Sequence, residues 1–445
     1  MAPPDGQPND PFIVSSVSAS STGSSDAENR WMRFGLSTNP YFVEPLSADP
    51  HGPRPIDLFQ GREKDAKEIL DTIAGEQNSL ILIEGPSGIG KSTFVNFVKH
   101  RLGKEYFAPA NEIGVQSYTT ADSLLLAVID SAVRHASDLV PNAKWEKEFP
   151  AIHTARQMVL ALRGIGWGYS AGIGIPGFAN IGATKPSAVQ PPLMGPVLTP
   201  SFFSELARDL MRITEPPCEG IIVHVNNLDT MVSASPKLAT QLFSDLREYF
   251  QVTHIHWIFL GPPGLYADIV ASERRLLPFV KASIDLEKLP AKDVDRLLEK
   301  RYEHYKLRND WIRPTSPALV KALYDQFGGD LRGTLNALSL AHKVYVPVDA
   351  KSMSESDGIS FLTGVYKKRL EKHLKGKTFH VLEFLIRIKK DEFTQDDVEP
   401  VEAHQSNRSV RFAEMENWDA IRLVRNDGAR KVYTFGGAAR IGFGL

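Results

Sequence analysis

Short apolar runs alternate with amphipathic stretches over residues 55–287 of the chain. The run Leu80-Ile81-Leu82-Ile83 is short and continuous, which is typical of a strand covered on both faces of a sheet. The same pattern predicts further strands at Ile113–Ser117, Ile221–Val225, His254–Leu260 and Ala282–Leu286. Because helical patterns separate these strands, the alternation predicts a parallel α/β sheet.

The pattern changes after this region. Residues 288–347 have helical periodicity throughout, and a polar linker is expected at 348–360. Residues 361–445 combine short helices with a hairpin, whose turn Asn426-Asp427-Gly428 separates two apolar runs. Helices followed by a β-hairpin predict a winged-helix domain.

The two remaining segments have unusual compositions. Residues 1–38 are rich in Ser, Pro, Asp and Ala, so we expect a disordered tail ahead of an ordered core at 39–287. A Gly-rich insertion at about 164–198 begins with a strict alternation of Gly or Ser with larger residues, which predicts a strand with one nearly bare face. That strand either packs on its own domain or contacts a partner.

One motif carries specific chemistry. Residues 85–92 fit the pattern GxxxxGK[ST] at every position, between a predicted strand and a predicted helix at Lys91–Leu102. Its glycines let backbone N–H groups surround phosphates, and the helix N-terminus adds positive charge. Lys91 is expected at the β- and γ-phosphates and Ser92 at a metal ion. The motif predicts ATP and Mg²⁺ as ligands, bound by Gly85, Pro86, Ser87, Gly88, Ile89, Gly90, Lys91, Ser92 and Thr93.

Phosphoryl transfer also needs an acidic residue at the end of a neighbouring strand. After the strand Ile221–Val225 the chain has Asn226 and Asn227, neither of which is a strong general base. Asn226 is the candidate metal ligand, and Asp229 and Glu84 are the nearest spare carboxylates. Two alternatives stay open: slow ATP hydrolysis, or a nucleotide that serves as a structural ligand.

Several motifs together resemble the AAA+ ATPases of the origin-recognition and initiator type. Leu58–Glu63 resembles the box that precedes the phosphate loop, and Gly328–Leu338 resembles the sensor-2 helix of the lid. The resemblance implies a P-loop NTPase sheet with a helical lid, followed by a DNA-binding winged helix. It implies that Arg332 reaches the γ-phosphate and that Arg274 or Arg275 serves as an arginine finger in an oligomer. The Asn-Asn pair departs from the family pattern, as does the absence of a polar sensor after Ile258-Phe259-Leu260.

Charge bounds the choice of partners. The chain of 445 residues has a formal net charge of -2, so nucleic-acid binding needs a local basic surface. Residues 361–445 contain 16 Lys or Arg and 12 Asp or Glu, a net of +4. The candidate DNA contacts are Arg408, Arg411, Arg422, Arg425, Arg430 and Lys431.

The cysteine count and the hydropathy of the chain indicate its cellular compartment. The single cysteine excludes a disulfide framework, and no apolar stretch reaches the length of a membrane span. We expect a cytoplasmic protein without membrane contact.

Two functional hypotheses follow. The first is an ATP-controlled, DNA-associated AAA+ switch or assembly factor that works as a homo-oligomer or with a protein partner. The second is an ATPase similar to the STAND signalling proteins, whose winged helix gates protein assembly instead of binding DNA. A nucleotide-bound scaffold without turnover is a further alternative, because of Asn226 and Asn227.

Overall fold

The computed structural model describes residues 30–47, 54–164, 198–344, 351–374, 376–427 and 430–445. The chain forms two compact units. One is Pro45–Glu287, and the other combines Lys288–Leu445 with the N-terminal residues up to Glu44. The expected insertion at 164–198 lies almost entirely outside the described residues.

The first unit is built on a parallel sheet with the strand order β2-β4-β5-β1-β6, in which β3 also pairs with β4. The five predicted strands are all present, although β3 is shorter than expected. The two-residue β2 was not predicted, because a run that short has no periodicity. The strands are β1 (Ser79–Glu84), β2 (Tyr106–Phe107), β3 (Ile113–Gly114), β4 (Gly220–Asn226), β5 (Ile255–Gly261) and β6 (Val280–Asp285).

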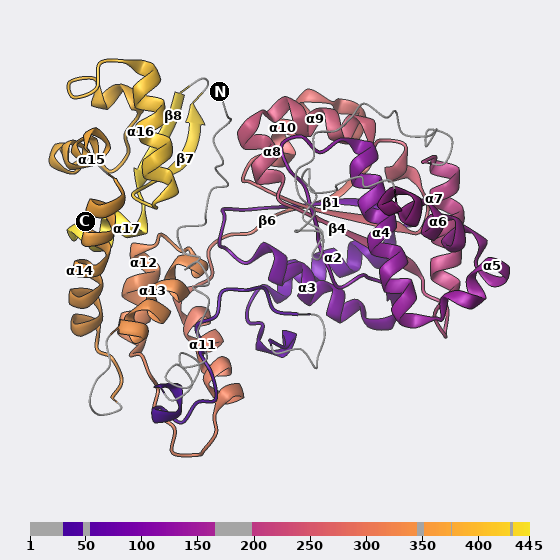
Figure 1. The fold of residues 1–445 in the computed structure, drawn as a ribbon, viewed down its shortest axis with the longest axis horizontal. Coiled ribbons are helices and arrows are strands. Elements are labelled where there is room, and N and C mark those ends of the chain that lie inside the picture. Colours follow the sequence, from indigo (N-terminus) through magenta and orange to yellow (C-terminus); the bar gives the residue numbers. More distant parts are fainter. Residues whose placement is uncertain (1–29, 48–53, 165–197, 345–350, 375, 428–429) are drawn as a thin grey trace. The chain divides into compact units, whose positions relative to one another are not determined.

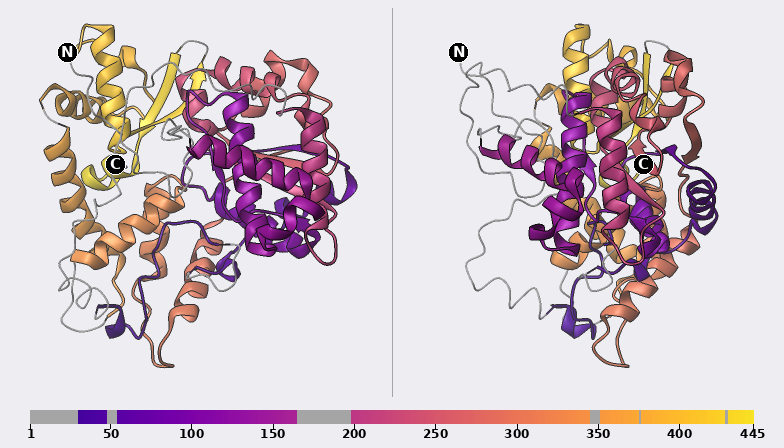
Figure 2. Two further views of the ribbon diagram at one scale, coloured as in Figure 1. Left: turned by 45° about the vertical axis from the view of Figure 1, so that its right-hand side comes forward. Right: turned by 90° about the vertical axis from the view of Figure 1, so that its right-hand side faces the viewer.

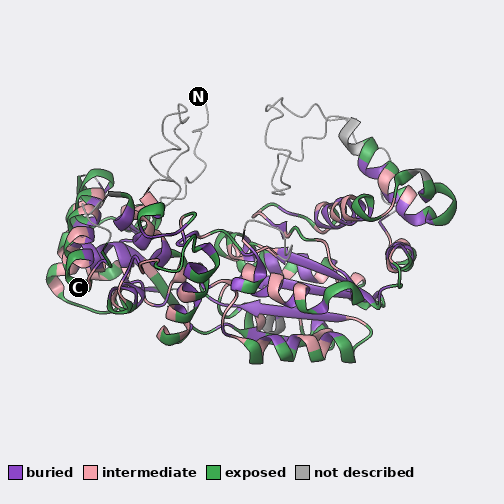
Figure 3. Ribbon diagram, turned by 90° about the horizontal axis from the view of Figure 1, so that it is seen from below, coloured by how far each residue is buried: buried purple, intermediate pink, exposed green. Residues whose placement is uncertain are grey.

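Both faces of the sheet are buried (Figures 1 and 2). Leu80 and Leu82 of β1 belong to one apolar cluster, and the alternate residues Ile81 and Ile83 belong to another. Figure 3 shows the strands as buried ribbons, with helices on both sides whose outer surfaces are exposed. A strand covered on both sides needs the continuous apolar run seen in the sequence.

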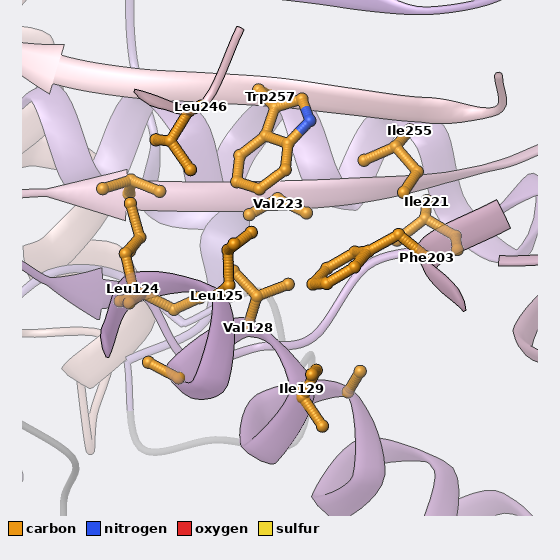
Figure 4. Packing of buried hydrophobic residues seen from close by; sticks show 14 of the residues in the cluster. Leu124, Leu125, Val128, Ile129, Phe203, Ile221, Val223, Leu246, Ile255 and Trp257 are labelled. Carbon is orange, nitrogen blue, oxygen red and sulfur yellow. The ribbon is translucent and has the colours of Figure 1, made fainter. Parts of the chain in front are cut away.

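Helices α4, α6, α7, α9 and α10 contribute to one cluster, and α2 and α3 contribute to the other. In Figure 4, Val223 and Trp257 of the sheet gather with side chains of α4. The helices are α2 (Glu63–Gly75), α3 (Lys91–Leu102), α4 (Ala121–Leu139), α5 (Trp145–Glu148), α6 (Pro150–Gly164), α7 (Pro200–Arg212), α8 (Leu228–Ala234), α9 (Pro236–Asp245) and α10 (Leu265–Ser272).

The second unit contains the predicted helical segment and the C-terminal helices and hairpin. Strands β7 and β8 are antiparallel, and Phe393 adds a bridge to Tyr433, so the hairpin packs beside the preceding helices. The elements are α11 (Ala291–Tyr305), α12 (Pro317–Gln326), α13 (Leu331–Val344), α14 (Glu355–His373), α15 (Lys377–Ile388), α16 (Gln405–Asn417), β7 (Ile421–Asp427), β8 (Arg430–Phe435) and α17 (Gly437–Phe443). The predicted fold class, a P-loop sheet with a helical lid and a C-terminal winged helix, is confirmed.

The lid and the winged helix are not separate bodies. One apolar cluster extends from Leu289 to Ile441, and α14 already begins at Glu355 inside the expected linker 348–360. Met353, also within that range, is only 4% exposed. The linker prediction therefore differs from the structure, because sparse apolar residues in a polar segment can still be buried by their neighbours.

The N-terminal segment also differs from the expected disordered tail. A helical turn begins at Arg30, and Trp31, Phe34 and Leu36 are buried against the lid helices. Arg301 fixes the segment further, since it donates to the carbonyl oxygens of Pro40 and Phe42 at 3.1 and 2.9 Å. The prediction used the average composition of residues 1–38, which is polar although apolar residues gather at the end of this segment. Residues 39–44 likewise belong to the second unit and not to the core, which corrects the predicted boundary.

No helix among the described residues has both the length and the apolar character that crossing a membrane requires.

Candidate functional site

The predicted phosphate loop lies between the end of β1 and the start of α3, as its mechanism requires. Gly85, Gly88 and Gly90 have φ angles of 149°, 80° and 98°, a region that favours glycine. A Cβ on Gly85 would also lie 3.1 Å from the carbonyl oxygen of Leu286. The loop conformation therefore depends on the glycines of the motif.

Lys91 is the first residue of α3, and only 8% of it is exposed. Its Nζ donates to the carbonyl oxygens of Gly85 at 2.5 Å and Pro86 at 3.3 Å. The same nitrogen lies 3.5 Å from Oδ2 of Asp229, in the first turn of α8. The ammonium group is thus held directly under the loop.

Ser92 contacts the residue that stands where an acidic residue was expected. Asn226 ends β4, and its Nδ2 donates to Ser92 Oγ at 3.0 Å. Its Oδ1 accepts from the backbone N–H of Asn227 at 2.7 Å, and Asn227 has φ 68° and caps α8. The pair therefore lies beside the phosphate loop, as predicted from the strand pattern.

Magnesium prefers oxygen ligands and keeps several of its waters. The Ser92 hydroxyl fits this requirement. The amide of Asn226 faces Ser92 with its nitrogen, so Asn226 can bind a metal only after its side chain turns. Among the described residues there is no group of three or more His, Cys, Asp or Glu side chains that could hold a metal. Phosphate oxygens would have to complete such a site.

The two nearby carboxylates have different roles. Glu84 is 6% exposed and accepts hydrogen bonds from the backbone N–H groups of Gly264 and Tyr266, both at 2.7 Å. It anchors the start of α10, so the expectation that Glu84 is a spare carboxylate needs correction. Asp229 has 37% of its side chain exposed. Burial raises the pKa of the Asp229 carboxyl, and Lys91 partly offsets this rise.

The segment Leu58–Glu63 packs against this region. Arg62 Nη2 donates to the carbonyl oxygen of Ile89 in the phosphate loop at 3.1 Å. Phe59 stacks on Phe97 of α3 with ring centroids 4.2 Å apart. The box before the phosphate loop therefore supports the loop and the helix that follows it.

The three candidate catalytic arginines belong to other elements of the structure. Arg274 and Arg275 form an exposed 3₁₀ turn ahead of β6 in the first unit. Arg332 is exposed in the first turn of α13, in the second unit. The structure thus brings together Lys91, Ser92, Asn226 and Asp229.

Two candidate DNA contacts are used for packing. Arg408 is 6% exposed and donates to the carbonyl oxygens of Glu402 and Ala403, both at 2.8 Å. Arg422 donates to the carbonyl oxygen of Phe327 at 2.6 Å and to Asp330 at 2.9 Å, which joins the hairpin to the lid. The burial of Arg408 corrects the prediction that it contacts DNA, whereas a contact of Arg422 with DNA stays a prediction.

The other four basic residues differ in how far they are exposed. Arg411 has 26% of its side chain exposed and lies 3.5 Å from Glu414. Arg425 pairs with Glu392 at 2.7 Å. Arg430 is 76% exposed and 3.7 Å from Asp396, and Lys431 is also exposed. Carboxylates of the same domain thus balance part of the positive charge.

No protein-family model matches this chain, and no curated protein matches it in sequence. Solved structures with a similar arrangement include the Aeropyrum pernix ORC1 protein in complex with DNA, at 13% identity and a TM-score of 0.42 over 87% of this chain and 94% of that one. The Aeropyrum pernix ORC2 protein in its ADPNP-ADP complexes matches at 12% identity and a TM-score of 0.43, over 91% and 95% of the chains. The Thermotoga maritima RuvB Holliday junction branch migration motor matches at 11% identity and a TM-score of 0.41, over 85% and 94%. At these identities and scores, the likeness does not define an activity for this chain.

Proposed function

We propose that this protein is an ATP-controlled switch with slow turnover, which binds Mg²⁺-ATP in the loop Gly85–Thr93. The observation that carries the proposal is the clustering of the Lys91 ammonium, the Ser92 hydroxyl and the start of α3 around that loop. Backbone N–H groups and a helix N-terminus favour phosphate binding, and the lysine supplies a fixed positive charge.

Slow turnover follows from the neutral residues at the end of β4. Asn226 and Asn227 place amides where hydrolysis needs a carboxylate, and an amide does not accept a proton from water at neutral pH. In this proposal Arg332 senses the γ-phosphate from the lid, and Arg274 or Arg275 completes the site of a neighbouring copy. Nucleotide state then controls assembly more than it drives repeated cycles.

The first test measures ATP and ADP binding by calorimetry and turnover by phosphate release, for the wild-type protein and Lys91→Ala. Loss of binding in Lys91→Ala supports the proposal, because the loop then lacks its only buried ammonium. Lys104→Ala, a change at an exposed lysine just beyond α3, is the matched control and should leave binding unchanged. Wild-type protein that binds neither nucleotide would refute the proposed function.

Two kinds of partner remain for the winged helix, and one observation favours a protein. The exposed residues of α16 include no lysine or arginine; they are Gln405, Ser406, Ser409, Val410, Ala413, Glu416 and Asn417. Val410 is 54% exposed. A helix that enters a DNA groove normally carries basic side chains, so this surface is better suited to a protein contact.

DNA association is the first hypothesis, and in this structure it would depend on the hairpin residues Arg425, Arg430 and Lys431. These residues can contact phosphates without reading base sequence. A salt-dependent shift of labelled duplex DNA that Arg430→Glu weakens supports DNA binding. ATP-dependent assembly in light scattering, unaffected by DNA and lost in Val410→Asp, supports the protein-contact alternative.

A further inference from the structure

The Lys91 ammonium lies among several oxygen acceptors. An ammonium group has three N–H donors, and the acceptors of the described residues include the carbonyl oxygens of Gly85 and Pro86 and Oδ2 of Asp229, all within 3.5 Å of Nζ. The two carbonyl groups belong to the phosphate loop itself. The Asp229 carboxylate carries a negative charge and comes from another element, α8.

A phosphate group that binds this lysine therefore competes with Asp229. The phosphate group and the Asp229 carboxylate are both anions, and each is stabilised by the charge of the Lys91 ammonium. The carbonyl groups are fixed by the loop backbone, whereas Asp229 is a side chain with 37% of its surface exposed. Asp229 is therefore the acceptor that can leave.

A displaced Asp229 would not be far from the reacting phosphate. In the structure its Oδ2 lies 3.5 Å from Lys91 Nζ, the nitrogen that is expected to contact the phosphates. Glu84 cannot take this role, since two backbone N–H groups and the Ser283 hydroxyl already occupy it. Asn226 and Asn227 are amides. Of these four residues, Asp229 is the carboxylate that is available for proton transfer.

We propose that Asp229 has two successive roles at this site: it occupies Lys91 in the absence of nucleotide, and after ATP displaces it, it acts as the base in hydrolysis. The inference rests on the proposed function, because it requires ATP in the loop. Burial raises the pKa of the Asp229 carboxyl, which makes it a stronger base than an exposed aspartate.

The oxygen of a water molecule forms a bond to the γ-phosphorus while the bond from that phosphorus to the β,γ-bridging oxygen breaks. The electron pair of the broken bond stays on ADP, and the proton of the attacking water passes to the Asp229 carboxylate. The proton then returns to solvent or to phosphate as the products leave.

The test compares Asp229→Asn with the wild-type full-length protein. The substitution removes the competing charge with almost no change of shape, so ATP should bind about two- to fivefold more tightly. Turnover should fall by about a hundredfold or to background, because the amide cannot accept a proton. Asp71→Asn, an exposed aspartate on α2, is the matched control and should change neither quantity.

Opposite changes in affinity and turnover separate this role from a structural one, since damage to the fold weakens both and lowers Tm. Asp229→Glu keeps the charge and should retain more turnover than Asp229→Asn. If Asp229→Asn binds ATP no more tightly at an unchanged Tm, the competition is refuted. If its turnover equals that of wild type, or wild type has no turnover, the role as base is refuted. Wild-type protein that binds no ATP would overturn the proposed function and this inference together.

Discussion

Lys99 lies two turns beyond the phosphate loop on α3, where a lysine is unusual because only 3% of it is exposed. Its Nζ donates to the carbonyl oxygen of Pro109 at 2.7 Å. Burial lowers the pKa of Lys99 from 10.5 to about 7, although the charge of Glu112 acts in the opposite direction. Replacing this lysine with methionine, which has a similar length and no charge, should stabilise the first unit.

The sign and the size of the effect follow from the two pKa values. The unfolded chain holds the Lys99 proton up to about pH 10.5, and the folded protein releases it near pH 7. Below pH 7 both states carry the charge and the folded state bears the full cost of burying it. The cost falls as pH rises from 7 towards 10.5. At about 1.4 kcal/mol for each tenfold change in proton affinity, the full cost is about 4 to 5 kcal/mol.

Methionine also loses the hydrogen bond to Pro109, which contributes about 1 kcal/mol. Lys99→Met should therefore raise the free energy of unfolding by about 3 kcal/mol at pH 6, and by progressively less towards pH 9. The assay is urea unfolding followed by tryptophan fluorescence, since Trp145 and Trp257 are both fully buried in this unit. Burial lowers the pKa values of His224 and His135 as well, and the Lys99 charge adds to both shifts.

Lys104→Met supplies the control, because Lys104 is exposed and close in sequence. Its free energy of unfolding should stay near that of wild type at every pH. A Lys99→Met protein that is less stable than wild type at pH 6 would contradict the reasoning. So would a stability difference that stays constant from pH 6 to pH 9.

Three further predictions concern single contacts. Arg422→Ala should lower the free energy of unfolding of the second unit by about 2 kcal/mol, because the buried Asp419 then lacks its paired guanidinium. Arg425→Ala removes an exposed ion pair with Glu392, and in the same thermal unfolding experiment it should change this free energy by less than about 1 kcal/mol. Glu84→Gln should lower Tm while the circular dichroism of the folded protein stays unchanged. The two N–H groups at the start of α10 donate to different oxygens of Glu84, and a glutamine amide has only one oxygen. An unchanged Tm would show that this anchor is dispensable. If DNA binds through the hairpin, Lys431→Ala should reduce the slope of log affinity against log salt by about 1, and an unchanged slope would exclude a phosphate contact at this residue.

The phosphate loop and the strand before it could be predicted because local signals determine them. A continuous apolar run ends in the GxxxxGK[ST] motif, and the helical face of Phe94, Val95, Val98 and Leu102 continues from it. The observed α3 has the predicted bounds, Lys91–Leu102. The contact between Ser92 and Asn226 was also within reach, since the carboxyl ends of parallel strands meet at one edge of the sheet.

The ion pair between Lys91 and Asp229 depends on the path of the chain after β4, which no local pattern specifies. Other misses had a usable signal. Arg408 lies on the same helical stripe as the buried Phe412 and Met415, a spacing that predicts an inward side chain. Arg422, by contrast, is held by residues almost a hundred positions earlier in the chain, so its role required the tertiary structure.

The neutral end of β4 also bears on metal dependence. The positive charge of Lys91 and the negative charge of Asp229 offset each other, and Asn226 carries no charge. An aspartate at position 226 would repel the triphosphate unless Mg²⁺ lay between them. The wild-type protein lacks this repulsion, so it should depend less on Mg²⁺ for binding ATP than Asn226→Asp does.

The comparison is the ratio of ATP Kd values in EDTA and in Mg²⁺, measured by calorimetry. The ratio should be about tenfold larger for Asn226→Asp than for wild type, because its carboxylate repels free ATP and attracts Mg²⁺-ATP. Asn142→Asp, at an exposed position in the same unit, should keep the wild-type ratio. Equal ratios for Asn226→Asp and wild type would mean that residue 226 does not approach the metal. The Ser92 hydroxyl and the phosphates would then hold Mg²⁺ without help from β4.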